Sequence, residues 1–432
     1  MTLSEPRHPS GQPEPQPVGQ TFPWVRGLLA ARRERHPLLR AGPRKGPYRH
    51  ELEALARQRL QHGPDWTAAA EGSGLTRTVI VAAGETAVIP RLIAVAEDDH
   101  GRPLSLIVEL LPGQLPGDYL AVADRLALAL DAAAVRFDAL GGRFLRITLL
   151  DDDPLGVAFD LPRVPISTSG DAVILGRDEA GRIVGHVIAR AAHIAVQGQN
   201  GSGKSAFLYG LLAQLAEAPD VLVAGCDPTG LLLGAPWDGT RHRDWQCAAG
   251  AGRADLHAAH LESLVAEMDR RLADMPPRVD TLTPSPDLPL IVVVLEEYPG
   301  LLRAAAAQPA PAKINGKAPP TVLQRIKLAT LRLLSESRKV AFRVIMLAQR
   351  AEAESMGGGY ARDQFALSIS FRVPADSLVM LHGDDARPWG SEHQIAPPGI
   401  ALVTAPGRPL TRLRVPWSGG YADYCARISG PQ

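Results

Sequence analysis

The sequence has little cysteine, no long apolar run and no excess of either charge. Its three cysteines, Cys226, Cys247 and Cys425, are too few and too far apart for a disulfide framework or a zinc site. No apolar stretch approaches the roughly 18 residues that a membrane span needs, and residues 1–20 lack the basic and apolar regions of a signal peptide. We therefore expect a reduced, cytoplasmic protein without an intrinsic transmembrane anchor.

The chain carries no net charge, because 46 Lys and Arg side chains balance 46 Asp and Glu side chains. A nucleic-acid partner could not be attracted by overall charge and would need a local basic surface. With 432 residues, of which 45% are hydrophobic, the chain exceeds one ordinary domain of about 100–200 residues. This length and this hydrophobic content predict two or three domains with packed cores.

Composition changes along the chain and predicts five parts. They are a disordered Pro-rich tail (1–23), a basic helical segment (24–75), a small α/β linker domain (76–165), a larger α/β domain (166–420) and a C-terminal tail (421–432). The basic segment holds eight Lys and Arg side chains between residues 24 and 50 against the single acid Glu34. It is either a solvated helix and loop or a contact to a polyanion such as DNA or an anionic membrane.

The elements of both α/β domains follow from apolar patterns. In the linker domain we expect strands at 78–82, 104–110 and 143–149 and a helix at 119–130. The larger domain has four short, continuous apolar runs separated by helical patterns, which is typical of a parallel sheet covered on both faces. These runs are 194–196, 221–224, 290–295 and 342–347.

The clearest motif is GQNGSGKS at residues 198–205, a complete G-x-x-x-x-G-K-S. It follows a predicted strand and opens a helix expected at 205–216, which is the context of a phosphate-binding loop. Backbone N–H groups would surround the phosphates, Lys204 would add positive charge, and the Ser205 hydroxyl would reach Mg²⁺. The predicted ATP-binding residues are Gly198, Gln199, Asn200, Gly201, Ser202, Gly203, Lys204, Ser205 and Ala206.

Two acids follow the apolar run 290–295, at the sheet edge where ligands of open α/β sheets bind. We expect Glu296 to bind Mg²⁺, directly or through water, and Glu297 to act as the general base that polarises the attacking water. Asp is the usual residue at the metal position and is one methylene shorter than Glu. Slow hydrolysis is therefore an open alternative.

A polar residue also ends the next predicted strand, at Gln349. We expect Gln349 to sense the γ-phosphate and to transmit its presence to the loop at 351–364. That loop contains three consecutive glycines, at positions 357–359, and should be mobile.

Several segments together resemble the FtsK/SpoIIIE family of ATP-driven DNA translocases, which belongs to the RecA-like additional-strand class. The resemblance spans about residues 76–417. It is carried by the approach to the phosphate loop with His193, by Asp227 and Pro228, and by the segments AEMDRRLADM (266–275), VVVLEEYPGLL (292–302), IMLAQRAE (345–352) and SISFRVPADSLVML (368–381). Residues 104–149 are similar to the linker domain that precedes the motor in this family.

The resemblance implies a RecA-like P-loop motor that assembles as a homo-hexameric ring and carries double-stranded DNA through its pore. ATP would lie between subunits, and a neighbour would supply an arginine to the γ-phosphate; the candidates are Arg338 and Arg372. Moving along any sequence requires phosphate contacts, which we place on the loops at 303–320 and 351–363. The expected DNA-binding residues are Arg303, Lys313, Lys317 and Arg362.

Three other interpretations remain open. Similar motors move polypeptides in actinobacterial protein secretion, HerA-like or conjugative coupling ATPases act on single strands or DNA ends, and a nucleotide-binding scaffold would hydrolyse little. Within the DNA class the chain resembles plasmid or integrative-element transfer proteins of filamentous actinobacteria, with a membrane or channel protein as a conceivable partner. We expect no winged-helix domain for sequence recognition after the motor.

Overall fold

The computed structural model describes residues 49–429, apart from 82–83, 164–165, 180, 191–192, 314, 316, 353–355 and 357. The expected tail 1–23 and the basic stretch 24–48 lie outside the described residues. The chain divides into two units, Met1–Gln58 and Arg59–Gln432. Of the first unit only the start of helix α2 (Arg49–Gly72) is described, and the second unit contains all the elements below.

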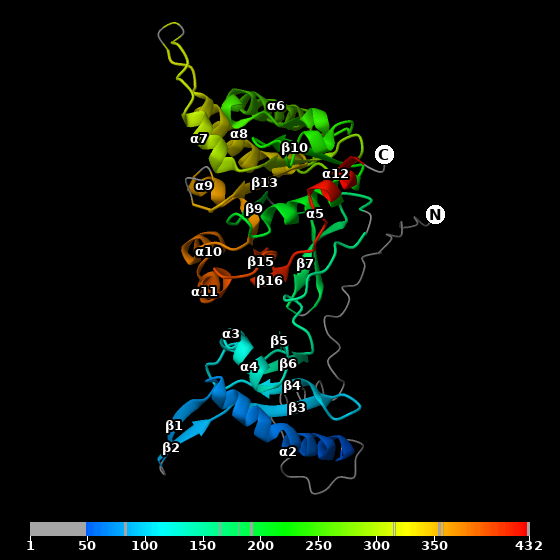
Figure 1. Cartoon of the computed structure of the whole chain (residues 1–432), viewed down its shortest axis with the longest axis vertical. Helices are drawn as coiled ribbons and strands as arrows, with labels where there is room; N and C mark the ends of the chain where they lie inside the picture. Colours follow the sequence, from blue (N-terminus) through cyan, green and yellow to red (C-terminus); the bar gives the residue numbers. More distant parts are fainter. Residues whose placement is uncertain are drawn as a thin grey trace, which may run out of the picture. The chain divides into compact units, whose positions relative to one another are not determined.

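The smaller α/β domain is built on an antiparallel sheet with the strand order β3-β4-β6-β5 (Figure 1). Its elements are the hairpin β1 (Arg77–Val81) and β2 (Gly84–Val88), the sheet strands β3 (Arg91–Glu97), β4 (Pro103–Glu109), β5 (Ala134–Ala139) and β6 (Phe144–Leu150), and the helices α3 (Pro116–Leu120) and α4 (Ala123–Ala129). The second half of α2 belongs to the same core, because Trp66 is buried among the sheet side chains and donates from Nε1 to the carbonyl of Pro90 at 2.6 Å.

The larger domain is built on a ten-stranded sheet in the order β11-β10-β12-β13-β9-β14-β15-β16-β7-β8 (Figure 1). The six strands from β11 to β14 are parallel, and the remaining pairs are antiparallel. The strands are β7 (Ala172–Asp178), β8 (Ile183–Val187), β9 (His193–Gln197), β10 (Val221–Cys226), β11 (Gln246–Cys247), β12 (Leu290–Leu295), β13 (Phe342–Ala348), β14 (Phe365–Ser370), β15 (Ile400–Thr404) and β16 (Thr411–Arg414).

Helices cover both faces of this sheet. Strand β12 shows why, since its alternate side chains enter two different cores: Val292 packs with α5 and α12, and Val293 packs with α6, α7 and α8. The helices are α5 (Lys204–Glu217), α6 (Ala254–Ala273), α7 (Tyr298–Ala306), α8 (Val322–Glu336), α9 (Gly359–Arg362), α10 (Ala375–His382), α11 (Gly390–His393) and α12 (Tyr421–Ser429), with short 3₁₀ turns η1 (Ala235–Trp237), η2 (Arg243–Trp245), η3 (Ala251–Arg253), η4 (Ser337–Val340) and η5 (Asp384–Trp389).

The expected fold class is confirmed: the chain is an α/β protein with a large, mostly parallel sheet. All four apolar runs predicted as buried strands form parallel neighbours in it, as β9, β10, β12 and β13. The antiparallel half of the sheet was not anticipated. Strands β7 and β15 contain apolar runs, at 172–175 and 400–403, that are as long as the run at 194–196 and were overlooked, whereas β8 and β16 are only partly buried.

Two expectations need correction. The helix expected at 119–130 is two short helices, α3 and α4, because the chain leaves the helical path at Ala121–Val122. The expected tail 421–432 contains helix α12, which belongs to the core of the larger domain. Tyr424 is fully buried there, stacks on Tyr209 at 4.6 Å and donates from its hydroxyl to the carbonyl of Leu232 at 2.6 Å.

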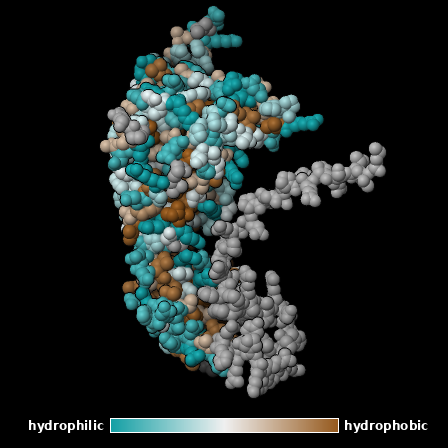
Figure 2. Space-filling model, turned by 90° about the vertical axis from the view of Figure 1, so that its right-hand side faces the viewer, coloured by the Kyte–Doolittle hydropathy of each residue, from teal (hydrophilic) through white to brown (hydrophobic). Residues whose placement is uncertain are grey.

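The surface gives no further constraint on the fold. The face shown in Figure 2 is mainly hydrophilic, and its apolar side chains lie in separate patches, as is usual for a surface in water. Among the described residues, no helix combines the length and apolar character that crossing a bilayer requires.

The burial of α12 leads to a stability prediction. Tyr424→Ala should lower the free energy of unfolding of the motor by about 3–5 kcal/mol, because it removes a buried ring and leaves the indole N–H of Trp237 without one of its two acceptors. Tyr421→Ala, on the same helix but 40% exposed, should cost less than about 1 kcal/mol. Urea unfolding measures both, and equal losses would contradict the role of α12 in the core.

Candidate functional site

The phosphate loop at residues 198–205 lies between β9 and α5 and is fixed by three neighbouring strands. The Gly198 N–H donates to the carbonyl of Ala348, which ends β13, at 3.3 Å. The Gln199 N–H donates to the carbonyl of Arg372, just after β14, at 2.9 Å. The Ser202 carbonyl accepts from the N–H of Gly399, just before β15, at 2.9 Å.

Glycine is required where the loop meets its surroundings. Gly203 has a φ of +104°, and a Cβ there would lie 2.6 Å from the backbone nitrogen of Gly399. A Cβ on Gly198 would lie 2.8 Å from that of Phe371. Both contacts are too short for a side chain, so these glycines allow the loop to dock against β14 and β15.

The loop and the first turn of α5 offer unused donors. Among the described residues, the backbone N–H groups of Gly201, Gly203, Lys204, Ser205 and Ala206 have no protein acceptor. The first N–H groups of a helix have no partner within the helix, and together with the helix dipole they attract anions. The remaining loop residues differ in exposure: Gln199 and Asn200 are exposed, and Ser202 is buried with a hydroxyl that has no hydrogen-bond partner.

Lys204 and Glu297 meet at the carboxyl edge of the sheet. The Lys204 Nζ lies 3.3 Å from the carbonyl oxygen of Ala348 and 3.9 Å from Oε2 of Glu297. Burial lowers the pKa of Lys204, and the carboxylates of Glu297 and Glu296 oppose that shift. Glu297 itself has a φ of +41°, an unfavourable conformation for a non-glycine residue that is found preferentially at functional sites.

Glu296 lies beside this pair in a different environment. Its Oε2 is buried and has no hydrogen-bond partner among the described residues. Burial, reinforced by the nearby carboxylates of Asp227 and Glu297, raises the pKa of Glu296 to about 7. A buried, unpaired carboxylate with a raised pKa is the kind of group that a cation would stabilise.

Asp227, part of the family resemblance, has a structural role in the loop after β10. Its two carboxylate oxygens accept from the N–H groups of Thr229, Leu232 and Leu233 at 2.7–2.9 Å, and from the Thr229 hydroxyl at 2.7 Å. These bonds leave Asp227 little capacity to bind a metal. It acts on the site through its negative charge, which contributes to the raised pKa of Glu296.

The residues present fit Mg²⁺ with few protein ligands. No group of three or more His, Cys, Asp or Glu side chains in the described ranges could hold a metal ion alone. Magnesium in nucleotide sites usually keeps several waters and takes one or two protein ligands plus phosphate oxygens. The exposed Ser205 and the unpaired Oε2 of Glu296 match that pattern.

Gln197, which the sequence analysis did not select, joins the phosphate-loop strand to the sensor strand. Its Oε1 accepts from the N–H of Ala351 at 2.8 Å, and its Nε2 donates to the Ser370 hydroxyl at 2.6 Å and to the Ser377 carbonyl at 3.0 Å. His382 continues this buried network, with Nε2 2.7 Å from the Ser370 hydroxyl. The available sequence signal was a polar glutamine between the apolar run 194–196 and the first loop glycine.

The structure places the sensor candidate Gln349 at the exposed end of β13, one residue after the carbonyl that contacts Lys204. The loop beyond Gln349 is described only in part, at residues 350–352, 356 and 358–363. Gln197 holds Ala351, the second residue after Gln349. The last carbonyl of β13 therefore contacts the phosphate loop, and the residue Ala351 after β13 is bonded to Gln197 on β9.

The two arginine candidates occupy opposite edges of the sheet. Arg338 is exposed on η4, before β13 begins, so it lies at the edge remote from the phosphate loop of its own chain. Arg372 follows β14 at the near edge, where its carbonyl holds Gln199.

The DNA-binding candidates are not all on loops. Arg303 was expected on a loop but lies on α7, because that helix continues to Ala306; its guanidinium is 3.9 Å from the Glu297 carboxylate. Arg362 ends the short helix α9. Lys313 and Lys317 are exposed in the connection between α7 and α8.

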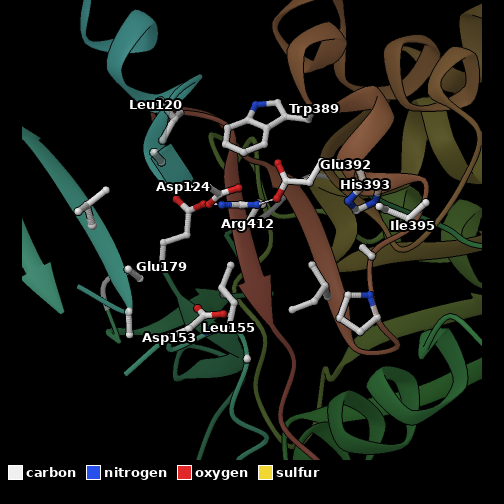
Figure 3. A pocket seen from close by; sticks show the side chains of 18 residues that line it. Leu120, Asp124, Asp153, Leu155, Glu179, Trp389, Glu392, His393, Ile395 and Arg412 are labelled. Carbon is white, nitrogen blue, oxygen red and sulfur yellow. Dashed lines mark hydrogen bonds and ion pairs between the residues drawn. The ribbon is translucent and has the colours of Figure 1, made fainter. Parts of the chain in front are cut away.

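A cavity of about 380 Å³ lies away from these residues, between α4, β5 and the segment from Trp389 to Arg412 (Figure 3). Arg412 crosses it, with its guanidinium 4.7 Å from the Trp389 ring centre and paired with Glu179 and Glu392. It contains no residue of the phosphate loop and none of the predicted catalytic residues. We therefore assign the nucleotide to the loop edge of the sheet, where the motif and the unused donors coincide.

Comparison with known proteins was made for sequence and for structure. No protein-family model matches the chain. Over 104 residues the chain is 36% identical to a protein named DNA translocase FtsK from Corynebacterium glutamicum, covering 23% of this chain and 11% of that protein. Over 124 residues it is 33% identical to the DNA translocase FtsK of Corynebacterium efficiens, covering 28% and 13%. The chain thus spans about an eighth of these relatives, and the resemblance to FtsK is confirmed over that segment.

Two solved structures are similar to the chain. The pCW3 conjugation coupling protein TcpA, in its monomer form with ATPγS, has a TM-score of 0.49 and 16% identity over 83% of this chain and 95% of that one. The cytoplasmic domain of the Type VII secretion ATPase EccC from Thermomonospora curvata has a TM-score of 0.47 and 19% identity over 64% and 32%. At these values the similarity carries no conclusion about the substrate.

The environment of Glu296 predicts a pH dependence of stability. Its pKa rises from 4.5 to about 7 on folding, so the folded chain holds this proton more tightly. The resulting stabilisation is complete below about pH 4.5 and is lost as the pH rises through about 7. Relative to Glu296→Gln, the nucleotide-free wild type should lose about 2–3 kcal/mol between pH 5 and 8. Denaturant midpoints at four pH values measure this, and parallel profiles would contradict it.

Proposed function

We propose that this FtsK/SpoIIIE-type P-loop ATPase hydrolyses ATP to move double-stranded DNA, as a ring of identical subunits. The observation that carries the proposal is the meeting of Lys204 and Glu297 beside the phosphate loop, in a chain whose matching segment is shared with FtsK translocases. The remaining roles below belong to the same proposal.

The site residues suit ATP hydrolysis. The backbone N–H groups of Gly201, Gly203, Lys204, Ser205 and Ala206 bind the phosphates, and the Lys204 ammonium stabilises the negative charge on the transferring group. Glu297 orients the attacking water and accepts its proton. Magnesium, held by Ser205 and Glu296, would supply positive charge to the phosphate oxygens.

The coupling to movement runs through β13. Its last carbonyl contacts Lys204, the next residue is the sensor Gln349, and Ala351 is held by Gln197. A change at the γ-phosphate would therefore displace the start of the glycine-rich loop. In a ring, Arg338 of one subunit would complete the site of its neighbour, because it lies at the sheet edge opposite its own loop.

The DNA contacts fall on the connection between α7 and α8. Lys313 and Lys317 are exposed there, and Glu297 is the N-cap of α7, so this helix connects the catalytic acid to the basic segment. Arg303 pairs with that acid, which makes it a less suitable phosphate ligand than the two lysines. Arg362 remains a further candidate on α9. Transfer of a plasmid or integrative element, a cytoplasmic location and a membrane or channel partner complete the proposal.

One prediction of the proposed function concerns ATP turnover. Turnover by the purified chain with Mg²⁺ should rise when double-stranded DNA is added, and Lys204→Ala should lower it at least 100-fold, on the order of the effect of removing one group that stabilises the transition state. Lys327→Ala, an exposed lysine on α8, is the matched control and should leave turnover unchanged.

The response to different polymers separates the alternatives. Stimulation by single strands in preference to duplex would favour a coupling-type ATPase. Turnover indifferent to either DNA would contradict translocation and favour a polypeptide substrate. Turnover that stays negligible with every polymer would favour a nucleotide-binding scaffold.

A second prediction concerns the basic connection. Lys313→Ala with Lys317→Ala should abolish most of the DNA stimulation and leave DNA-free turnover intact. The slope of log affinity against log salt should fall by about 0.9 for each DNA phosphate that the variant no longer binds. The matched control removes two exposed lysines elsewhere, Lys327 and Lys339. An unchanged slope in the first double variant would exclude this segment from the DNA interface.

A further inference from the structure

Trp417 is an exposed aromatic residue in a segment that is otherwise fixed. Its side chain is 51% exposed, whereas Pro416 and Ser418 on either side are buried. Its backbone is held on both sides, since its N–H donates to the carbonyl of Phe159 and its carbonyl accepts from the N–H of Leu161, both at 2.8 Å. The indole is thus presented to solvent from a rigid backbone.

The neighbours of Trp417 place it beside the phosphate loop. Before it, the Val415 N–H donates to the carbonyl of Gly399 at 2.8 Å, and Gly399 is the residue that approaches Gly203. After it, the Ser418 hydroxyl lies 3.4 Å from the carbonyl oxygen of Ala206. The segment from Val415 to Ser418 therefore runs alongside the stretch from Gly203 to Ala206.

The surface of α5 lies within van der Waals distance of both segments that hold Trp417. Gly210 lies one turn after Ala206 on α5, and a Cβ at that position would meet Ser418 at 3.5 Å and Leu161 at 3.6 Å. The two segments that hold the Trp417 backbone, 159–161 and 415–418, thus approach the first two turns of α5 through Leu161 and Ser418. Movement of α5 relative to Trp417 is restricted by these contacts.

A nucleotide in the loop needs a site for its base. The N–H groups of Gly203, Lys204, Ser205 and Ala206 have no protein acceptor among the described residues and bind phosphate oxygens under the proposed function. We therefore place the ribose and base beyond the first turn of α5. A purine ring has two apolar faces, and stacking on an aromatic side chain is the usual way to hold it. Trp417 is the half-exposed aromatic residue whose chain neighbours contact that turn.

We infer that the Trp417 indole stacks on the purine base of the bound nucleotide and sets the preference of the site for a nucleoside triphosphate over bare polyphosphate. This inference rests on the proposed function, because it needs ATP in the loop. It adds a determinant that lies outside the phosphate-binding motif and more than 200 residues after it in the sequence.

The test compares ATP with inorganic tripolyphosphate, which has the phosphates but no base. Trp417→Ala should weaken ATP binding about tenfold and leave tripolyphosphate binding within about twofold of the wild type. Trp417→Phe should retain most of the ATP affinity, since it keeps an aromatic face. Binding is measured by calorimetry on the full chain in the presence of Mg²⁺.

Each alternative result has a defined meaning. Equal weakening of both ligands by Trp417→Ala would overturn the inference, because Trp417 would then act only through the shape of the loop. Unchanged ATP binding in that variant would overturn it as well. If Lys204→Ala bound both ligands like the wild type, or if the wild type bound neither, the proposed function would fail first and the inference with it.

Discussion

The phosphate loop keeps its shape because its backbone is bonded to the ends of three other strands. Gly198, Gln199 and Ser202 each exchange a hydrogen bond with a different strand end, on β13, β14 and β15 respectively. Lys204 adds a fourth contact through the Ala348 carbonyl. A loop held in this way presents its N–H groups in a fixed arrangement without a ligand, and such preorganisation avoids reorganisation during the reaction.

This constraint explains the position of the other site residues. Parallel strands end at one edge, so Glu296 after β12 and Gln349 after β13 come close to the loop after β9. Because β9 and β12 end at the same edge of the sheet, Nζ of Lys204 lies 3.9 Å from Oε2 of Glu297. Oε2 of Glu296 is buried without a hydrogen-bond partner among the described residues, whereas Oε2 of Glu297 faces Lys204, so the two adjacent acids are in different environments.

Much of this could be read from the sequence, because the parallel half of the sheet follows from local patterns. A β-branched run identifies β12, a mainly apolar run identifies β13, and G-x-x-x-x-G-K-S identifies the loop between β9 and α5. Contacts between distant segments could not be read in the same way. Neither the approach of Gly399 to Gly203 nor that of Ser418 to Ala206 has a local signal, since each depends on the register of the antiparallel strands β15 and β16. Helix α12 was missed although Tyr421, Tyr424, Cys425 and Ile428 stand at helical spacing, because its short segment near the end of the sequence was interpreted as a tail.

The amide of Gln197 has a consequence for the protons around it. Since its oxygen accepts from Ala351 and its nitrogen donates to Ser377, the amide can have only one orientation, and its second N–H points at the Ser370 oxygen. Ser370 then gives its own hydrogen to His382, whose remaining ring nitrogen must carry a hydrogen toward Thr404. The chain of polar groups has one direction, and His382 is fixed as the neutral Nδ1–H tautomer, in agreement with a pKa that burial lowers to about 3.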